Sequence, residues 1–135
     1  MDNNTILQKL NSAPGSKFCK LNEYNSNRMG GAKTTYLPSL EEVARVIKSI
    51  PKGKTKTISE LRQIIARKAG TETSCPATLL KYWKWMANLS DESKIKYKQY
   101  DIPWWRVLKD GKPSRHMPGG IPNQMKILKS EGVII

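Results

Sequence analysis

Apolar and polar positions alternate with a helical period in two neighbouring segments of the chain. Each segment opens with a capping box, at residues 39–42 and 57–60, in which a hydroxyl and a carboxylate satisfy the free N–H groups of a helix start. Apolar side chains then recur every three or four positions until a helix-breaking residue, Pro51 in the first segment and Gly70 in the second. The pattern predicts two amphipathic helices joined by a short loop.

A third helix is predicted from Pro76 to about Asn88, with Cys75 at its N-cap, because proline is favoured at the first helical position. With about 100° of rotation per residue, its core face gathers Leu79, Leu80, Trp83, Met86 and Ala87. Its outer face gathers Thr78, Lys81, Trp85 and Asn88, flanked by Tyr82 and Lys84. Trp85 has two interpretations: it packs under residues 89–103, or it offers a stacking surface to a nucleic acid, as Tyr82 could.

The last part of the chain has a different pattern. Residues 104–108 are predicted to form a short strand, with a hairpin turn at Asp110-Gly111 and a final helix from Pro122 to Gly132. Two capped helices followed by a hairpin predict a mainly α fold, a winged helix-turn-helix-like DNA-binding domain with a small β-hairpin wing.

The predicted domain covers residues 37–135. Residues 1–36 are rich in asparagine, contain Pro-Gly and Gly-Gly pairs, and show no sustained period. They are predicted to be a poorly structured N-terminal arm.

The chain of 135 residues is strongly basic, with 24 Lys and Arg against 11 Asp and Glu and a formal net charge of +13. Such a surplus concentrates anions around a protein, so the expected partner is a polyanion, double-stranded DNA in particular. No stretch approaches the roughly 18 apolar residues of a membrane span, and the N-terminus lacks the pattern of a signal peptide. We therefore expect a monomer without membrane contact, in the cytoplasm with the nucleoid or in the nucleus.

Metal-ligating residues are scarce. Cys19, Cys75 and the single histidine, His116, are too few for the usual four-ligand zinc site. Neither a metal nor another cofactor is expected.

Two kinds of DNA contact are expected. Cations beside a helix start bind phosphates, and a polar, cationic helix face enters a groove. The residues for phosphate are Lys52, Lys54, Lys56 and Thr57, and those for the minor groove are Lys81, Lys84, Trp85 and Asn88.

An ordered set of short motifs runs from residue 37 to the end of the chain. The motifs are Ile50-Pro51-Lys52-Gly53, Lys68-Ala69-Gly70, Asn88, Ile102-Pro103-x-x-Arg106-Val107, Asp110-Gly111, Gly119-Gly120 and Ser130-Glu131-Gly132. In order and spacing this set resembles the DNA-binding domain of the methylated-DNA–protein cysteine methyltransferases and of the alkyltransferase-like proteins.

The resemblance to the methyltransferases implies that their chemistry is lost. There a cysteine thiolate accepts the alkyl group from guanine, and a histidine oriented by a glutamate activates it. In this chain the matching positions hold Trp104, Trp105 and Glu131. An indole is neither a thiolate nor a general base, so no alkyl transfer and no catalytic residue are expected.

The resemblance to the alkyltransferase-like proteins implies a non-enzymatic protein that senses alkylated guanine in DNA and passes it to nucleotide excision repair proteins. A pocket for the extruded base would be lined by Trp104, Trp105, Arg106, Gly119 and Gly120. The family's recognition-helix arginine has no counterpart, since residues 71–105 contain no arginine.

Alternatives remain for the function and for single residues. Cys75 is either a relocated nucleophile activated at a helix N-terminus, which would make the protein an enzyme, or a small capping residue. A third function is a protein-interaction module that has lost lesion recognition. Trp104 and Trp105 are either one core ring and one pocket ring or two rings that fill the pocket.

Overall fold

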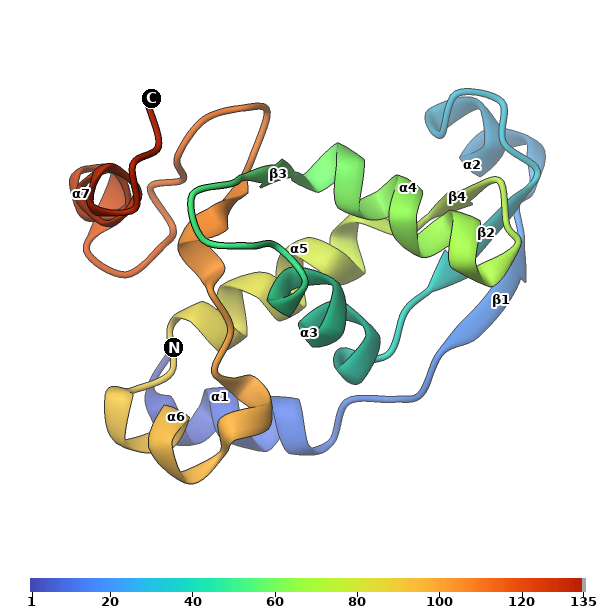
Figure 1. Cartoon of the computed structure of the whole chain (residues 1–135). Helices are drawn as coiled ribbons and strands as arrows, with labels where there is room; N and C mark the ends of the chain where they lie inside the picture. Colours follow the sequence, from blue (N-terminus) through green and yellow to red (C-terminus); the bar gives the residue numbers. More distant parts are fainter. Residues whose placement is uncertain (135) are drawn as a thin grey trace.

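The computed structural model describes residues 1–134 and is dominated by helices (Figure 1). The helices are α1 (Asn3–Asn11), α2 (Glu23–Arg28), α3 (Leu40–Lys48), α4 (Ile58–Ala69), α5 (Pro76–Ala87), α6 (Asp91–Lys96) and α7 (Gly120–Ser130), with 3₁₀ turns η1 (Lys98–Tyr100) and η2 (Trp104–Arg106). The strands are β1 (Lys17–Lys20), β2 (Thr34–Leu37), β3 (Lys56–Thr57), β4 (Thr73–Ser74) and β5 (Val107–Leu108). The predicted mainly α fold is confirmed.

Helices α3, α4 and α5 enclose the core. Val43 from α3, Leu61 from α4 and Trp83 from α5 are fully buried. The capping boxes predicted at 39–42 and 57–60 are both present, so these helices begin where the sequence places them.

The connection between α4 and α5 is longer than the three or four residues of a typical helix-turn-helix. Gly70 ends α4 in the left-handed conformation, with φ of 76°, and β4 then pairs in parallel with β2. Arg62 holds this connection, because its Nε donates to the Ser74 carbonyl and its Nη2 to Thr73 Oγ1, both at 3.1 Å.

Residues 1–36 differ from the predicted poorly structured arm. Ile6 and Leu10, one turn apart on α1, are buried in the core. The α1 helix is also tied to the segment after α5, since Tyr100 Oη donates to Asn11 Oδ1 at 2.6 Å and Asn3 Nδ2 donates to Ser93 Oγ at 2.8 Å. These partners lie some 90 positions away in the chain, so the local sequence around α1 does not indicate these contacts.

The remainder of the arm forms a sheet. Strand β1 pairs antiparallel with β2, which places Phe18 opposite Tyr36, and the strand order is β1-β2-β4. The arm therefore supplies β1 as the edge strand of a sheet that also contains β4, the strand between α4 and α5 (Figure 1).

The predicted β-hairpin wing is reduced to its turn. Asp110 and Gly111 both have positive φ, 52° and 75°, and two backbone hydrogen bonds join Lys109 to Lys112, as in a tight hairpin turn. The predicted strand over 104–108 is wrong for its first three residues, which form η2. Its remainder, β5, pairs in parallel with β3 instead of within a hairpin.

Both backbone groups of Trp104, the first residue of η2, have partners outside the sheets. The N–H of Trp104 donates back to the Ile102 carbonyl at 2.8 Å, and the Trp104 carbonyl accepts from Trp83 Nε1 at 3.0 Å. Both groups are therefore withdrawn from sheet pairing.

None of the helices in residues 1–134 has the length and apolar character needed to span a membrane.

Candidate nucleic-acid interface

Part of the predicted outer face of α5 is open to solvent. Lys81 and Asn88 are exposed and Lys84 is half-buried, and their spacing puts them on one side of the helix. Asn88, the C-cap residue, donates from Nδ2 to the carbonyl of Lys84 at 2.8 Å and to that of His116 at 3.1 Å. The second bond attaches the loop that precedes α7 to the end of α5.

That loop brings further cations to α5. A hollow of about 410 Å³ is bordered by the exposed side chains of Lys109, Lys112, Arg115 and His116, and Asp110 also borders it. The name "basic face" is used below for Lys81, Lys84, Asn88, Lys109, Lys112, Arg115 and His116. The loop cations are not among the DNA contacts expected from the sequence, although three Lys and Arg within seven residues around an Asp-Gly turn could have indicated a basic loop.

The potential over the basic face is positive. The charge of Lys84, then partial desolvation, and then the charges of Arg115 and Lys109 lower the pKa of His116 below its ordinary value of 6.5. A nearby like charge disfavours the charged form of a group, so the neutral imidazole prevails at pH 7. An anion at this face is attracted by the same positive charges that disfavour the imidazolium.

Carboxylates offset the charge of the basic face only in part, since Asp110 alone borders the hollow beside Lys109, Lys112 and Arg115. The carboxylates of Asp2, Glu42 and Glu60 accept hydrogen bonds from backbone N–H groups at the starts of α1, α3 and α4. Within residues 1–134 the ion pairs are Lys56–Glu60 and Arg106–Glu131, neither of which involves the basic face.

The residues expected to bind phosphate between α3 and α4 differ in availability. Lys52 and Lys54 are exposed on the turn before β3. Lys56 pairs with Glu60 at 3.7 Å, and Thr57 Oγ1 accepts from the Glu60 N–H at 3.1 Å and donates to its carboxylate. The carboxylate of Glu60 also repels a phosphate at this helix start, so Lys52 and Lys54 are the better placed candidates.

The two aromatic candidates of α5 are not free stacking surfaces. Tyr82, expected on the flank of the outer face, is buried, with 2% of its surface exposed. Trp85 is half-buried, with the ammonium groups of Lys9 and Lys81 at 5.6 and 5.3 Å from its ring centroid. Helix α1 therefore covers the side of Trp85 that residues 89–103 were expected to cover. Thr78 is buried as well, so the open stripe of α5 is narrower than predicted.

The tryptophans at the expected lesion pocket fill it. Trp104 is 5% exposed and belongs to the core, and Trp105 is half-buried with its ring edge-on to Trp104 at 5.6 Å between centroids. Lys94 Nζ lies 6.0 Å from the Trp104 ring and donates to the Ala87 carbonyl at 3.0 Å. Trp104 is therefore a core side chain in this structure, and a base could stack on its ring only if the packing of the two indoles changed.

Arg106, also expected at the pocket, is engaged elsewhere. Its Nε and Nη2 donate to the two carboxylate oxygens of Glu131 at 3.0 and 2.7 Å, and its Nη1 donates to the Ile50 carbonyl at 2.9 Å. This bidentate clamp joins η2, the end of α3 and the end of α7. Glu131 is a structural acceptor here.

Gly119 and Gly120 have a structural role at the start of α7. Gly119 has φ of 75°, and a Cβ on it would lie 2.6 Å from Cβ of Asn123, whose Nδ2 donates to the Pro118 carbonyl at 2.8 Å. The backbone therefore requires glycine here whether or not a ligand binds.

Cys75 has no histidine partner. Its N–H donates to the Tyr36 carbonyl at 2.9 Å, and its side chain makes no cap hydrogen bond. His116 is bonded to the opposite end of α5, and a helix of 12 residues spans about 18 Å. Within residues 1–134, no three His, Cys, Asp or Glu side chains are grouped so that they could hold a metal ion.

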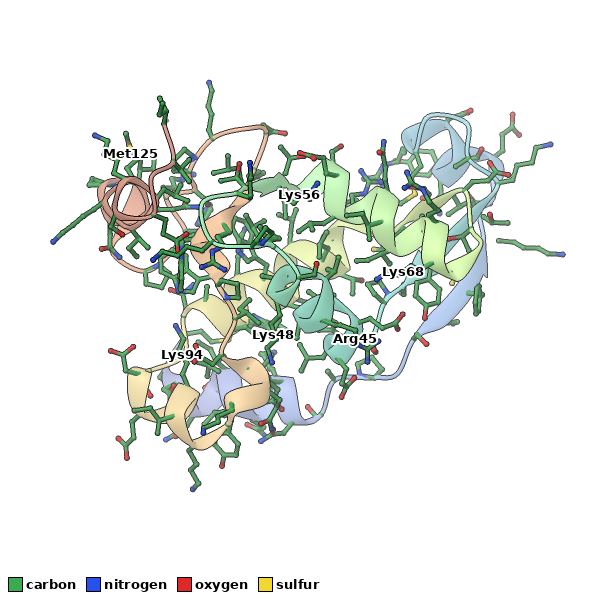
Figure 2. All side chains as sticks on the ribbon, viewed as in Figure 1. Arg45, Lys48, Lys56, Lys68, Lys94 and Met125 are labelled. Carbon is green, nitrogen blue, oxygen red and sulfur yellow. The ribbon has the colours of Figure 1, made fainter. Side chains whose placement is uncertain are left out.

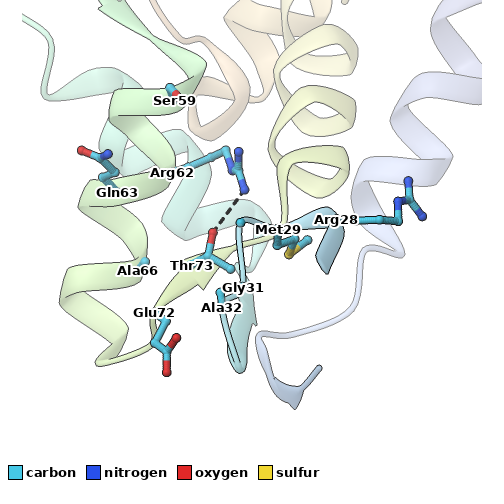
Figure 3. Close-up of a pocket in the computed structure, with 11 residues that line it drawn as sticks. Arg28, Met29, Gly31, Ala32, Ser59, Arg62, Gln63, Ala66, Glu72 and Thr73 are labelled. Carbon is cyan, nitrogen blue, oxygen red and sulfur yellow. Dashed lines mark hydrogen bonds between the residues drawn. The ribbon is translucent and has the colours of Figure 1, made fainter. Parts of the chain in front are cut away.

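A larger hollow lies apart from the basic face and from the residues of the expected lesion pocket. It has a volume of about 550 Å³ and lies between α4 and residues 28–32 (Figure 3). Arg62, Gln63 and Glu72 border it, and the Arg62 guanidinium is bonded to Thr73, as the dashed line shows. None of the residues predicted from the sequence lines this hollow.

No family model and no curated protein matches the chain. Among solved structures, the chain is similar to ATL, an alkyltransferase-like protein of S. pombe, in a crystal structure of its complex with DNA. The sequence identity is 26%, the match covers 71% of this chain and 77% of that chain, and the TM-score is 0.47.

Proposed function

We propose that the chain is a non-enzymatic DNA-binding protein and that the basic face holds the duplex. The observation that carries this proposal is the junction of α5 with the loop before α7, made by the Asn88 bond to the His116 carbonyl. It gathers onto one surface cations that form no ion pair with any residue from 1 to 134. Cations so arranged attract the phosphates of DNA and release its condensed counterions.

Each part of the basic face has a proposed role. The stripe of Lys81, Lys84 and Asn88 on α5 faces a groove, in the manner of the second helix of a helix-turn-helix. The loop from Lys109 to His116 lies along the adjacent phosphates, as a shortened wing. Lys52 and Lys54 are proposed as further phosphate contacts, while Thr57, Trp85 and the clamped Arg106 keep their structural roles.

Recognition of alkylated guanine and delivery of the lesion to repair proteins is the narrower form of this proposal. It is supported by the motif resemblance, from Ile50-Pro51-Lys52-Gly53 to Ser130-Glu131-Gly132. The packing of Trp104 and Trp105 opposes it, because an extruded base needs both rings to move.

We therefore expect a preference for O6-methylguanine over guanine in the same duplex of less than about twofold, since no open stacking surface rewards base flipping. Competition titrations with the two duplexes at equal salt measure this ratio. A preference of tenfold or more would show that the tryptophans open, and Trp104→Ala would then change it. Equal affinity for both duplexes leaves DNA binding intact and removes lesion sensing.

A further inference from the structure

A second basic surface lies on the sheet at the other end of the molecule. In Figure 1 strands β1 and β2 with α2 lie at the right, whereas α7 and the loop before it lie at the left. The surface belongs to residues 17–37, which the proposed duplex site does not use.

Two aromatic rings are open to solvent on this surface. Phe18 on β1 is 64% exposed and Tyr24 on α2 is 68% exposed. All other aromatic side chains of residues 1–134 are buried or half-buried. The exposure of these two rings leaves large apolar faces free for a ligand.

Phe18 is held in place and borders a hollow. Its ring lies 4.9 Å from that of Tyr36, its partner across the β1–β2 pair, with an angle of 58° between the rings. The adjoining hollow has a volume of about 350 Å³, is mainly apolar, and is bordered by Phe18, Cys19, Lys20, Thr34, Gly70 and Thr71.

A cation lies beside each of the two rings. Lys20, two positions along β1, is exposed on the same face of the strand as Phe18, whereas the exposed Lys17 lies on the opposite face. The Arg28 guanidinium lies 5.6 Å from the centroid of the Tyr24 ring. Within residues 17–37 the charged side chains are Lys17, Lys20, Arg28 and Lys33 against Glu23. Glu72 adds a second carboxylate, which accepts from the Lys33 N–H at 3.1 Å, so the surface keeps a positive surplus. No strand of the described residues pairs with the outer edge of β1, because β1 ends the strand order.

We propose that this surface binds single-stranded nucleic acid, with bases stacked on Phe18 and Tyr24 and phosphates beside Lys20 and Arg28. Exposed rings on a sheet, flanked by cations, supply the stacking and the backbone attraction that unpaired strands require. The bases of a duplex have no free faces, so this surface prefers unpaired strands. The positive surplus favours this ligand over a protein partner. The proposal goes beyond duplex binding by the basic face and does not depend on it.

The test measures binding of fluorescein-labelled oligo(dT) and of a labelled duplex by anisotropy. The variants are Phe18→Ala, Tyr24→Ala and both together, and the matched control is Ile95→Ala, which removes a 73% exposed side chain from α6. We expect the double variant to bind oligo(dT) at least about tenfold more weakly, while duplex affinity changes less than about twofold. Ile95→Ala is expected to change neither, and circular dichroism melting checks that every variant is folded.

Three results would overturn the proposal. They are unchanged oligo(dT) binding by the double variant, an equal loss for duplex and single strand, and no oligo(dT) binding by the wild type at low salt. Self-association abolished by Phe18→Ala, without oligo(dT) binding, would assign the surface to a second copy of the chain. A basic-face variant should keep its oligo(dT) binding at this surface, so failure here is distinguishable from failure of the duplex site.

Discussion

The triple variant Lys84→Ala, Lys109→Ala, Arg115→Ala is expected to bind duplex DNA about a hundredfold more weakly at low salt. Each of these cations belongs to the basic face and none forms an ion pair within residues 1–134. Loss of three phosphate contacts should also lower the logarithmic salt slope by about 3, since each neutralised phosphate contributes about 0.9. Anisotropy titrations at several salt concentrations give both values.

A matched variant separates the surface from the net charge. The triple variant Arg45→Ala, Lys68→Ala, Lys98→Ala also removes three positive charges, but from exposed positions on α3, α4 and η1 (Figure 2 labels the first two). We expect it to weaken duplex binding less than about fivefold, through the general field alone. Equal losses for the two triple variants would mean that the basic face is not the binding surface.

Glu131→Ala is expected to lower the free energy of unfolding by about 2–3 kcal/mol, or the melting temperature by about 7–10 °C, because it leaves the Arg106 guanidinium without its bidentate partner. The side chains of the pair are only 15% and 8% exposed. Urea unfolding at pH 7 measures the change. Lys56→Ala, which breaks the exposed pair with Glu60, is the control and should cost less than about 0.5 kcal/mol.

The same clamp has a pH signature. The hydrogen bonds from Arg106 hold the pKa of Glu131 below its ordinary value of 4.5. Because the folded pKa lies below the unfolded one, this stabilisation is complete at neutral pH and is lost as the pH falls below about 4.5. Glu131→Gln should therefore unfold with a flatter pH dependence in acid. If wild type and Glu131→Gln lose stability in parallel between pH 5 and pH 3, the clamp is not a source of the acid sensitivity.

Local signals explain why the middle of the fold could be predicted from the sequence. Ser39 and Thr57 with their partner glutamates, Pro76 and Gly70 each act within one helical turn, so the bounds of α3, α4 and α5 follow from neighbouring residues. The Asp110-Gly111 turn was predicted for the same reason.

The N-terminal region could not be predicted because its stabilising contacts are distant in sequence. Ile6 and Leu10 alone show a helical spacing there, and α1 is fixed by Tyr100 and Ser93 far along the chain. Strand β1 pairs with a segment separated from it by α2. Trp85 lies on the predicted outer face of α5, but it is half-buried because α1 packs over it.

Only the α5 part of the candidate site could be predicted, because the loop part is brought to it by a contact that is distant in sequence. Lys81, Lys84 and Asn88 share a helix face, which the 3.6-residue period reveals. Their junction with Lys109 and Arg115 depends on one hydrogen bond between Asn88 and the His116 carbonyl, 28 positions apart. Whether Trp104 lines a pocket or fills it depends on volumes in the folded core, which a motif does not record.

The most direct test of the central claim is the salt dependence of duplex binding by the wild-type chain. If four to six cations neutralise phosphates, the logarithm of the association constant should fall with the logarithm of salt concentration with a slope of roughly −4 to −5. The account predicts that slope, with affinities for unrelated sequences that differ little at each salt concentration. A slope near zero, or no binding to duplex DNA at low salt, would contradict it.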